Sequence, residues 1–238
     1  MNDNKLKTIK NICSTFEKLN IDAIGIKLLN INSEKIKQLN IKKSTKKLRH
    51  CQFIDYVRKN KNVIYSTVDE QACIGGASAL GFLRLPENIQ SGMFYYNNLK
   101  QFENINAAKK TIDSISFLDA NSFNCIIYFY LNENNINKLD VEMIDPDVLL
   151  LFLNPKKTML LTQCYVYKFG GFINSKFSGR QSFCSDAVAR VIKNQSPNIT
   201  VGCGGSRKYT DIKDDELLLS IPWNDIEVLN EGLIHLLK

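Results

Sequence analysis

The chain has 238 residues, of which 44% are hydrophobic, 10% aromatic and 23% charged. A chain of this length buries about 70–75% of the surface that its unfolded form exposes, so it can fold without disulfide or metal staples. Twelve glycines and five prolines are too few for a fibrous or wholly disordered chain. No apolar run has the length of a membrane helix, and the first residues do not have the pattern of a secretory signal. We therefore expect a compact cytoplasmic protein.

Basic residues outnumber acidic ones by 31 to 24, which gives a formal charge of +7. The one concentrated basic patch comprises Lys42, Lys43, Lys46, Lys47 and Arg49, and it ends just before Cys51. No aromatic residue that could stack on a base is interleaved in this patch. We therefore expect a solvated basic face and no nucleic-acid partner.

The first third of the chain alternates between helical and strand patterns. Apolar residues at helical spacing predict a long helix over residues 4–20 and shorter helices over 33–39 and 52–59. Strands are predicted over 21–29 and 63–68. Residues 71–85 predict a Gly-rich turn followed by a helix that Pro86 closes.

The rest of the chain continues this alternation. Aromatic and β-branched residues predict a strand over 123–131, and the apolar run 147–153 predicts a buried central strand. Asn154 and Pro155 are typical of a helix start, and Gly170-Gly171 of its end. A strand over 216–221 precedes a closing helix that runs to Leu237. These patterns predict an α/β or α+β fold, a single compact domain over residues 1–238 with a central mixed sheet flanked by helices.

The seven cysteines fall into two groups by their surroundings. Three lie on apolar faces of predicted helices or strands and are expected in the core: Cys13, Cys125 and Cys164. Four lie in predicted turns among polar residues, cations or glycines: Cys51, Cys73, Cys184 and Cys203. The second group is therefore the candidate functional set.

Turn cysteines beside glycines suit a metal centre, because backbone amides without a Cβ can approach a metal-bound sulfur. The glycines in question are Gly75, Gly76, Gly204 and Gly205, and Arg207 could offset negative charge nearby. Four thiolates match a tetrahedral zinc ion or a cubane iron–sulfur cluster. The sequence has no C-x-x-C pair, so unrelated loop thiols are the alternative at this point.

Other catalytic chemistry has weaker support in the sequence. His50 adjoins Cys51, and adjacent residues do not share a face of a helix or a strand, which argues against a Cys–His dyad. The acidic cluster Asp211, Asp214, Asp215 and Glu216 is expected to form a solvated turn. Arg207 and Lys208 follow a Gly-rich segment that could bind an anion but lacks the P-loop spacing.

Several segments together resemble one known family. They comprise Cys51-Gln52 followed by Arg58, the run Cys73–Gly81, the run Asp145–Pro155, Cys184, the run Gly202–Arg207 and the run Asp215–Pro222. In this order they are similar to the DUF169 family, uncharacterised proteins found mainly in archaea and anaerobic bacteria. The resemblance covers nearly the whole chain. It implies that Cys51, Cys73, Cys184 and Cys203 are the family's recurrent cysteines, and it implies no established activity.

The expected function is therefore that of an iron–sulfur protein. Cys51, Cys73, Cys184 and Cys203 would hold a [4Fe–4S] cluster with a redox or electron-transfer role, because an oxygen-poor setting favours iron–sulfur over zinc. Two alternatives remain open. One is a thiol-based enzyme acting on an anionic small molecule, and the other is a structural zinc-binding scaffold. The expected partner is a redox protein or a small anionic ligand.

Overall fold

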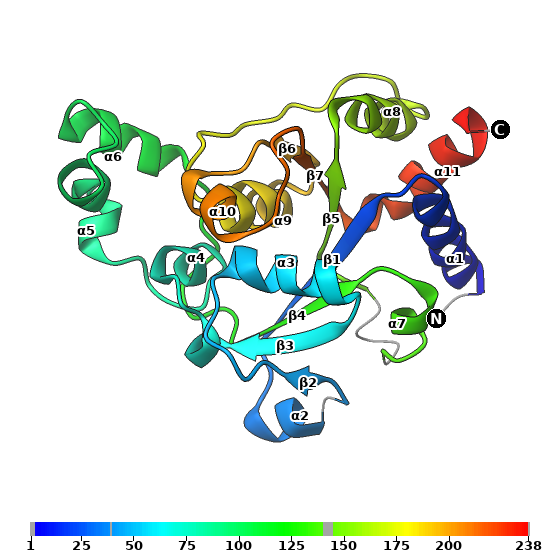
Figure 1. The fold of residues 1–238 in the computed structure, drawn as a ribbon, viewed down its shortest axis with the longest axis horizontal. Coiled ribbons are helices and arrows are strands. Elements are labelled where there is room, and N and C mark those ends of the chain that lie inside the picture. Colours follow the sequence, from blue (N-terminus) through cyan, green and yellow to red (C-terminus); the bar gives the residue numbers. More distant parts are fainter. Residues whose placement is uncertain (1–2, 39, 140–144, 238) are drawn as a thin grey trace.

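A seven-stranded mixed sheet runs through the molecule in the order β2-β3-β4-β1-β5-β7-β6 (Figure 1). The computed structural model describes residues 3–38, 40–139 and 145–237. The strands are β1 (Asp22–Leu29), β2 (Lys42–Lys43), β3 (Val63–Thr67), β4 (Cys125–Tyr130), β5 (Val148–Leu153), β6 (Asn198–Thr200) and β7 (Leu217–Pro222). Strands β2 and β3 pair in parallel, and every other neighbouring pair is antiparallel.

The helical segments lie on both faces of this sheet and beyond one end of it. In chain order they are α1 (Asp3–Lys18), α2 (Ser33–Gln38), α3 (His50–Asn60), η1 (Val68–Glu70), α4 (Ile74–Ala79), α5 (Glu87–Gln90), η2 (Phe94–Asn98), α6 (Ile105–Ser114), α7 (Glu133–Ile136), α8 (Pro155–Val166), η3 (Ser182–Ala189), α9 (Arg190–Asn194), α10 (Gly204–Tyr209), η4 (Trp223–Asp225) and α11 (Ile226–Leu236). Segments η2 and η3 are π-helical, and η1 and η4 are 3₁₀.

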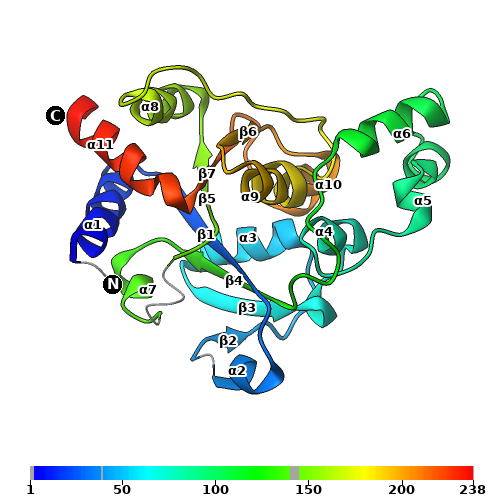
Figure 2. The ribbon, with the colours of Figure 1, turned by 180° about the vertical axis from the view of Figure 1, so that it is seen from behind.

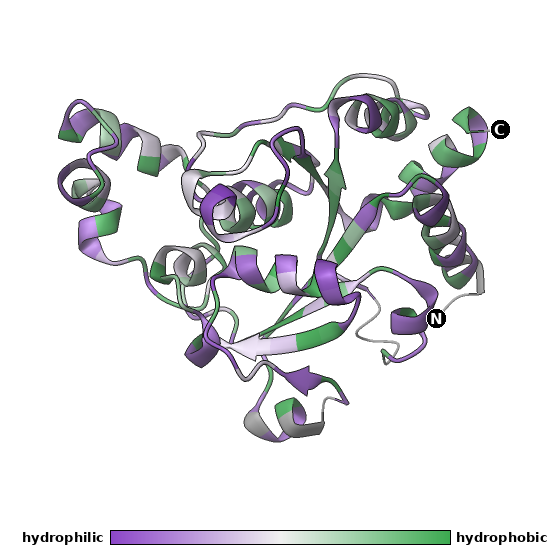
Figure 3. Ribbon diagram, in the orientation of Figure 1, coloured by the Kyte–Doolittle hydropathy of each residue, from purple (hydrophilic) through white to green (hydrophobic). Residues whose placement is uncertain are grey.

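The sheet is apolar on both faces, which explains why its central strands read as nearly continuous hydrophobic runs. All six residues of β5 are buried, and Figure 3 shows this strand as hydrophobic along its length. In β1, Ala23 points into one core cluster while Ile24 and Ile26 point into the other. Gly25 pairs with Phe129, whose ring occupies the place of the missing side chain, since a Cβ at Gly25 would lie 2.2 Å from it.

One face of the sheet is covered by α1, α8 and α11. The terminal helices α1 and α11 lie side by side in both ribbon views (Figure 2). Helices α8 and α11 approach so closely that a Cβ at Gly232 would come within 1.9 Å of the Cys164 carbonyl oxygen, so this crossing requires glycine. Cys13, Cys125 and Cys164 are all buried in this layer, as predicted.

The opposite face is covered by α3, α4, η3 and α9. Their apolar side chains, with Phe53 and Val57 from α3, Leu80 just after α4, and Phe183 and Val188 from η3, pack on the second core cluster. Beyond this layer, α5, η2 and α6 form an arm that projects past the end of the sheet (Figure 1). The arm has its own small core, built from Ile89, Tyr95, Ile112 and Ile115.

Most of the predicted elements are confirmed, within a few residues, by α1, β1, α3, β3, β4, β5, α8, β7 and α11. The predicted α+β class with a central mixed sheet flanked by helices is confirmed as well. Leu39, the predicted end of the second helix, lies outside the described residues. The prediction for 71–85 is wrong, because Gly75 and Gly76 lie inside α4, which ends at Ala79. In the described residues no helix is long and apolar enough to cross a membrane.

Candidate functional site

The four candidate cysteines all lie at the N-termini of helical segments. Cys73 is the N-cap of α4 and Cys203 is the N-cap of α10. Cys51 lies in the first turn of α3, and Cys184 in the first turn of the π-helix η3. Figure 1 shows α3, α4 and α10 next to one another on the same side of the sheet. The expectation that all four lie in turns is therefore wrong for Cys51 and Cys184, because local glycine and serine content does not prevent a helix whose apolar side is buried.

The other three candidate thiols are all within electrostatic range of Cys184, although the four cysteines are far apart in the sequence. The sulfur atoms of Cys73 and Cys184 lie 3.7 and 3.9 Å from the position that a Cβ at Gly76 would take. Cys51 is close enough to Cys203 and Cys73 for their charges to raise its pKa, and Cys184 is close enough to the other three for the same effect. The structure thus brings together the set that was selected from sequence context.

Local hydrogen bonds fix the starts of α10, α3 and η3. The Cys203 amide donates to Ser206 Oγ at 2.8 Å, and the Ser206 amide donates back to Cys203 Sγ at 3.4 Å, so the cysteine takes part in a reciprocal cap. At α3, the Arg49 amide donates to Gln52 Oε1 at 3.1 Å. The Cys184 thiol donates to the Gln181 carbonyl oxygen at 3.4 Å. Two of these contacts involve a candidate sulfur atom, that of Cys203 and that of Cys184.

Burial keeps two of the thiols protonated. Burial raises the pKa of Cys51 to about 12, with the charges of Cys203 and Cys73 adding to the shift and Arg49 opposing it. Burial also raises the pKa of Cys184 well above its ordinary value, and the three other cysteines add to it. The helix N-termini oppose this effect, because their amides carry partial positive charge that favours a negative ligand. Cys184 is buried, whereas Cys51, Cys73 and Cys203 are partly accessible.

The predicted glycines differ in their relation to the sulfur atoms. Gly76 borders Cys73 and Cys184, and a Cβ at Gly205 would lie 3.8 Å from Cys203 Sγ. Gly75 borders the side chain of Gln181 instead, and Gly204 has open space around it. Gly76 and Gly205 are therefore the two glycines that leave room next to sulfur.

The predicted cations Arg207 and Arg49 have different roles. Arg207 donates four hydrogen bonds to the backbone carbonyl oxygens of Val201, Lys213 and Glu216, so it holds the loop after α10. Within the basic patch, Arg49 is the member whose charge lowers the pKa of Cys51, and its guanidinium lies 4.2 Å from the centre of the Tyr209 ring. Arg49, at the start of α3, is therefore the cation that acts on a candidate thiol, which the sequence did not predict.

His50 takes no part in the thiol cluster through hydrogen bonding. Its Nδ1 lies 3.0 Å from the Tyr128 hydroxyl, and burial lowers its pKa to about 3. The ring is therefore neutral and faces the sheet, which agrees with the sequence argument against a Cys–His dyad.

No group of three or more His, Cys, Asp or Glu side chains within 3–38, 40–139 and 145–237 is arranged so that it could hold a metal ion as it stands. This finding argues against a preformed site for a single ion. Two thiolates on one tetrahedral zinc lie only about 3.8 Å apart, given a Zn–S bond of about 2.3 Å. Thiolates that bind different irons of a cubane cluster are farther apart.

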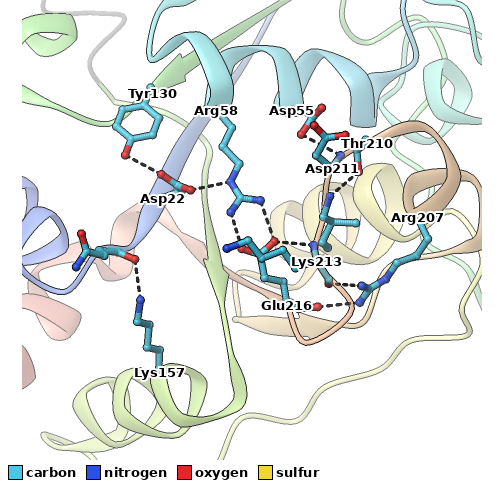
Figure 4. Close-up of polar contacts among 12 residues, drawn as sticks. Asp22, Asp55, Arg58, Tyr130, Lys157, Arg207, Thr210, Asp211, Lys213 and Glu216 are labelled. Carbon is cyan, nitrogen blue, oxygen red and sulfur yellow. Dashed lines mark hydrogen bonds and ion pairs between the residues drawn. The ribbon is translucent and has the colours of Figure 1, made fainter.

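A buried ion network fixes the elements that carry Cys51 and Cys203 (Figure 4). Arg58 of α3 donates to both carboxylate oxygens of Glu216, at 2.9 and 2.5 Å, and to Asp22 of β1 at 2.7 Å. Its guanidinium also lies 4.1 Å from the centre of the Phe152 ring. The sequence does not predict this network, and the expectation that Glu216 lies in a solvated turn is wrong, because Glu216 is buried and paired with Arg58.

Three other residues at the site were also missed. Gln181 accepts a hydrogen bond from the Cys184 thiol and donates one to the Tyr95 hydroxyl. Neither Gln181 nor Tyr95 lies in a recognised motif, and the bond between them forms only when the arm folds. Ser206 had no signal of its own, because the reciprocal cap that a sequence reveals has Glu or Gln three residues after the N-cap.

Comparison with known proteins places this arrangement in a family. The DUF169 family model, described as "Uncharacterised ArCR", matches residues 15–232. This chain belongs to the DUF169 family. It is also 36% identical over 188 residues to "Uncharacterized protein MJ0308" of Methanocaldococcus jannaschii, a match that covers 79% of this chain and 76% of the relative. No solved structure matches. The family resemblance of the sequence is thereby confirmed.

The ion network predicts a pH-dependent loss of stability in Glu216→Gln. Burial alone would raise the pKa of Glu216, but hydrogen bonds from Arg58 and the Lys213 amide outweigh it and hold the pKa below its ordinary value. The charged carboxylate therefore stabilises the fold above the ordinary Glu pKa of about 4.3, and this contribution is lost as the pH falls through the folded-state pKa. We expect Glu216→Gln to cost on the order of 3 kcal/mol at pH 7, and the deficit to shrink in acid.

Urea unfolding at a series of pH values measures this deficit. Glu231→Gln is the matched control, because Glu231 pairs with Lys168 on an exposed surface and such pairs contribute little. Equal effects of the two substitutions at pH 7 would show that the network does not hold α3 and the loop before β7.

Proposed function

We propose that this DUF169 protein binds a [4Fe–4S] cluster through Cys51, Cys73, Cys184 and Cys203 and has a redox or electron-transfer role. The observation that carries the proposal is the division of the seven cysteines. Three lie in the core layer of α1, α8 and α11, and the other four meet at helix N-termini on the opposite side of the sheet. Unrelated thiols would have no reason to lie at four helix N-termini on one side of the sheet.

The donor set fits an iron–sulfur cluster. Four thiols converge, and thiolates are the usual ligands of such clusters. The nearest histidine, His50, has its Nδ1 atom 3.0 Å from the Tyr128 hydroxyl, so this ring nitrogen is occupied.

The electrostatics of the site also support the proposal. Four thiolates around a cluster carry excess negative charge, and the N-termini of α3, α4, η3 and α10 offer partial positive charge. Arg49 adds a full positive charge next to Cys51. Because the thiols of Cys51 and Cys184 are protonated at neutral pH, loading would release protons and would improve as the pH rises.

The position of the site suits exchange of single electrons, which is the chemistry that a bound cluster supplies. Cys51, Cys73 and Cys203 are partly accessible, and Ile74 beside Cys73 is 56% exposed. A redox partner protein or a small anionic ligand could therefore approach the site from this side without passing through the core.

A thiol-based enzyme is less well supported. A nucleophilic cysteine needs a lowered pKa, and the structure raises the pKa of both Cys51 and Cys184. Arg207, which would have bound an anionic substrate in that alternative, is occupied by three backbone carbonyls. Structural zinc remains an outcome that metal analysis distinguishes.

Metal analysis of oxygen-free protein tests the proposal. After anaerobic reconstitution with iron and sulfide we expect a brown protein with about four irons and four labile sulfides per chain, as a cubane requires. Tightly retained zinc without visible absorbance would instead favour the structural zinc scaffold. A colourless protein without iron would contradict the cluster.

The assignment of ligands is tested by Cys203→Ser and Cys164→Ala. A serine hydroxyl replaces a soft thiolate poorly, so Cys203→Ser should lose most of the iron while the fold persists on its own core. Cys164→Ala removes a buried thiol in the other layer, so it should cost about 1 kcal/mol of stability and retain the iron. Iron per chain and melting temperature are measured for both. Full iron occupancy in Cys203→Ser would show that the ligands are assigned wrongly.

Gly76→Ala tests whether space between the sulfur atoms is needed. The added methyl would fit the protein without metal, because its contacts with Cys73 and Cys184 are ordinary van der Waals distances. It would, however, occupy the space beside both sulfurs, so we expect at least tenfold weaker iron retention against a chelator, with little change in melting temperature. Gly204→Ala is the control, since nothing lies within 4 Å of its added methyl. Equal iron retention in the two variants would refute the role of Gly76.

A further inference from the structure

The arm places a tyrosine next to the thiol cluster. Tyr95 lies in the π-helix η2, is only 8% exposed and belongs to the arm's own small core. The exit of the arm is attached to the helix of Cys184, because the Ser116 amide donates to Ser185 Oγ and Ser185 Oγ donates to the Ser116 carbonyl oxygen. Both the arm and the helix of Cys184 contain a π-helical segment, η2 and η3, and such segments are frequent at functional sites.

Gln181 connects this tyrosine with the cysteines. The side-chain amide of Gln181 donates to the Tyr95 hydroxyl at 2.8 Å. The backbone carbonyl oxygen of Gln181 accepts a hydrogen bond from Cys184 Sγ. Its Nε2 atom also lies 3.2 Å from the position that a Cβ at Gly75 would take, so Gln181 sits between η3 and α4. Gln181 has a φ of 48°, an uncommon left-handed conformation for a residue other than glycine. Such strain is found where the position of a side chain matters for function.

The hydroxyl of Tyr95 has a hydrogen left to donate. Its oxygen accepts from Gln181, and it donates no hydrogen bond to any residue in the described part of the chain. Burial raises the pKa of Tyr95 to about 12; the bond from Gln181 opposes this shift, and the charges of Cys184, Cys73 and Cys203 add to it. The hydroxyl is therefore protonated at neutral pH, is linked to Cys184 through Gln181, and has no acceptor among the described residues.

We propose that Tyr95, positioned by Gln181, donates a hydrogen bond to the sulfur atoms of the bound cluster and thereby raises its reduction potential. This inference rests on the proposed function. It identifies Tyr95 as a hydrogen-bond donor to the cluster and Gln181 as the positioning residue, while the four thiols complete the ligand set.

The direction of the effect follows from charge. Reduction adds one negative charge to the cluster, and a hydrogen-bond donor stabilises the more negative state more strongly. Hydrogen bonds to the sulfurs are among the factors that set cluster potentials. Removal of the donor should therefore disfavour the reduced state and make the potential more negative.

Tyr95→Phe tests the inference in the full chain after anaerobic reconstitution. We expect unchanged iron per chain and a more negative midpoint potential in a dye-mediated titration followed by electron paramagnetic resonance. A tenfold loss of relative stability of the reduced state corresponds to 59 mV for one electron. Tyr96→Phe is the matched control, because it removes a hydroxyl from the next residue of the same helix, and it should leave the potential unchanged.

Gln181→Leu provides a second variant that retains the tyrosine. It removes the side-chain amide that fixes the Tyr95 hydroxyl, so we expect the midpoint potential to shift in the same direction by a smaller amount. If Tyr95→Phe does not take up a cluster, the potential of Gln181→Leu tests the role of Tyr95 in its place. A loaded Tyr95→Phe, or in its place a loaded Gln181→Leu, with the wild-type potential would overturn the role of Tyr95 and leave the cluster itself intact. A wild-type chain that takes up no iron would overturn the proposed function, and this inference with it.

Discussion

The ion network of Arg58 is the interaction that holds the elements of the candidate cysteine site together. It joins helix α3 to the central strand β1 through Asp22, and to the chain just before β7 through Glu216. The start of α3 carries Cys51, and the segment that ends at Glu216 begins at α10, which carries Cys203. Arg58 lies at the far end of α3 from Cys51, so one ion network sets the axis of the helix and leaves its N-terminus free for the thiols.

Arg207 completes this arrangement from the other side. Its bonds to the Val201, Lys213 and Glu216 carbonyl oxygens close the loop around α10, and Arg49 stacks on Tyr209 at the end of the same helix. The cations near the site therefore have different roles. Arg58 binds the carboxylates of Asp22 and Glu216, Arg207 binds backbone carbonyl oxygens, and Arg49 acts on the charge of Cys51.

The sequence predicted the features that depend on local pattern. The amphipathic stripe of α1, the apolar run of β5 and the Asn154-Pro155 start of α8 each reflect burial or capping within one element. The sorting of cysteines succeeded for the same reason, because Cys13, Cys125 and Cys164 have apolar neighbours on their own elements.

The features that depend on tertiary contacts were not predicted. Glycines at 75 and 76 suggested a turn, and packing of α4 on the second core cluster overrode that preference. The burial of Glu216 depends on Arg58, which is remote in sequence, and the left-handed backbone of Gln181 is compensated by contacts with η3 and the arm. No local pattern contains such information.

The order of the four cysteines along the chain has a consequence for biosynthesis. A ribosome releases the chain from its N-terminus at about 5–20 residues per second, so the thiols of Cys51 and Cys73 emerge well before those of Cys184 and Cys203. The last of the four comes into place only when α10 forms and β7 pairs with β5. A zinc knuckle of adjacent cysteines can capture its metal on a nascent chain. The four-thiol site of this protein exists only in a nearly finished molecule.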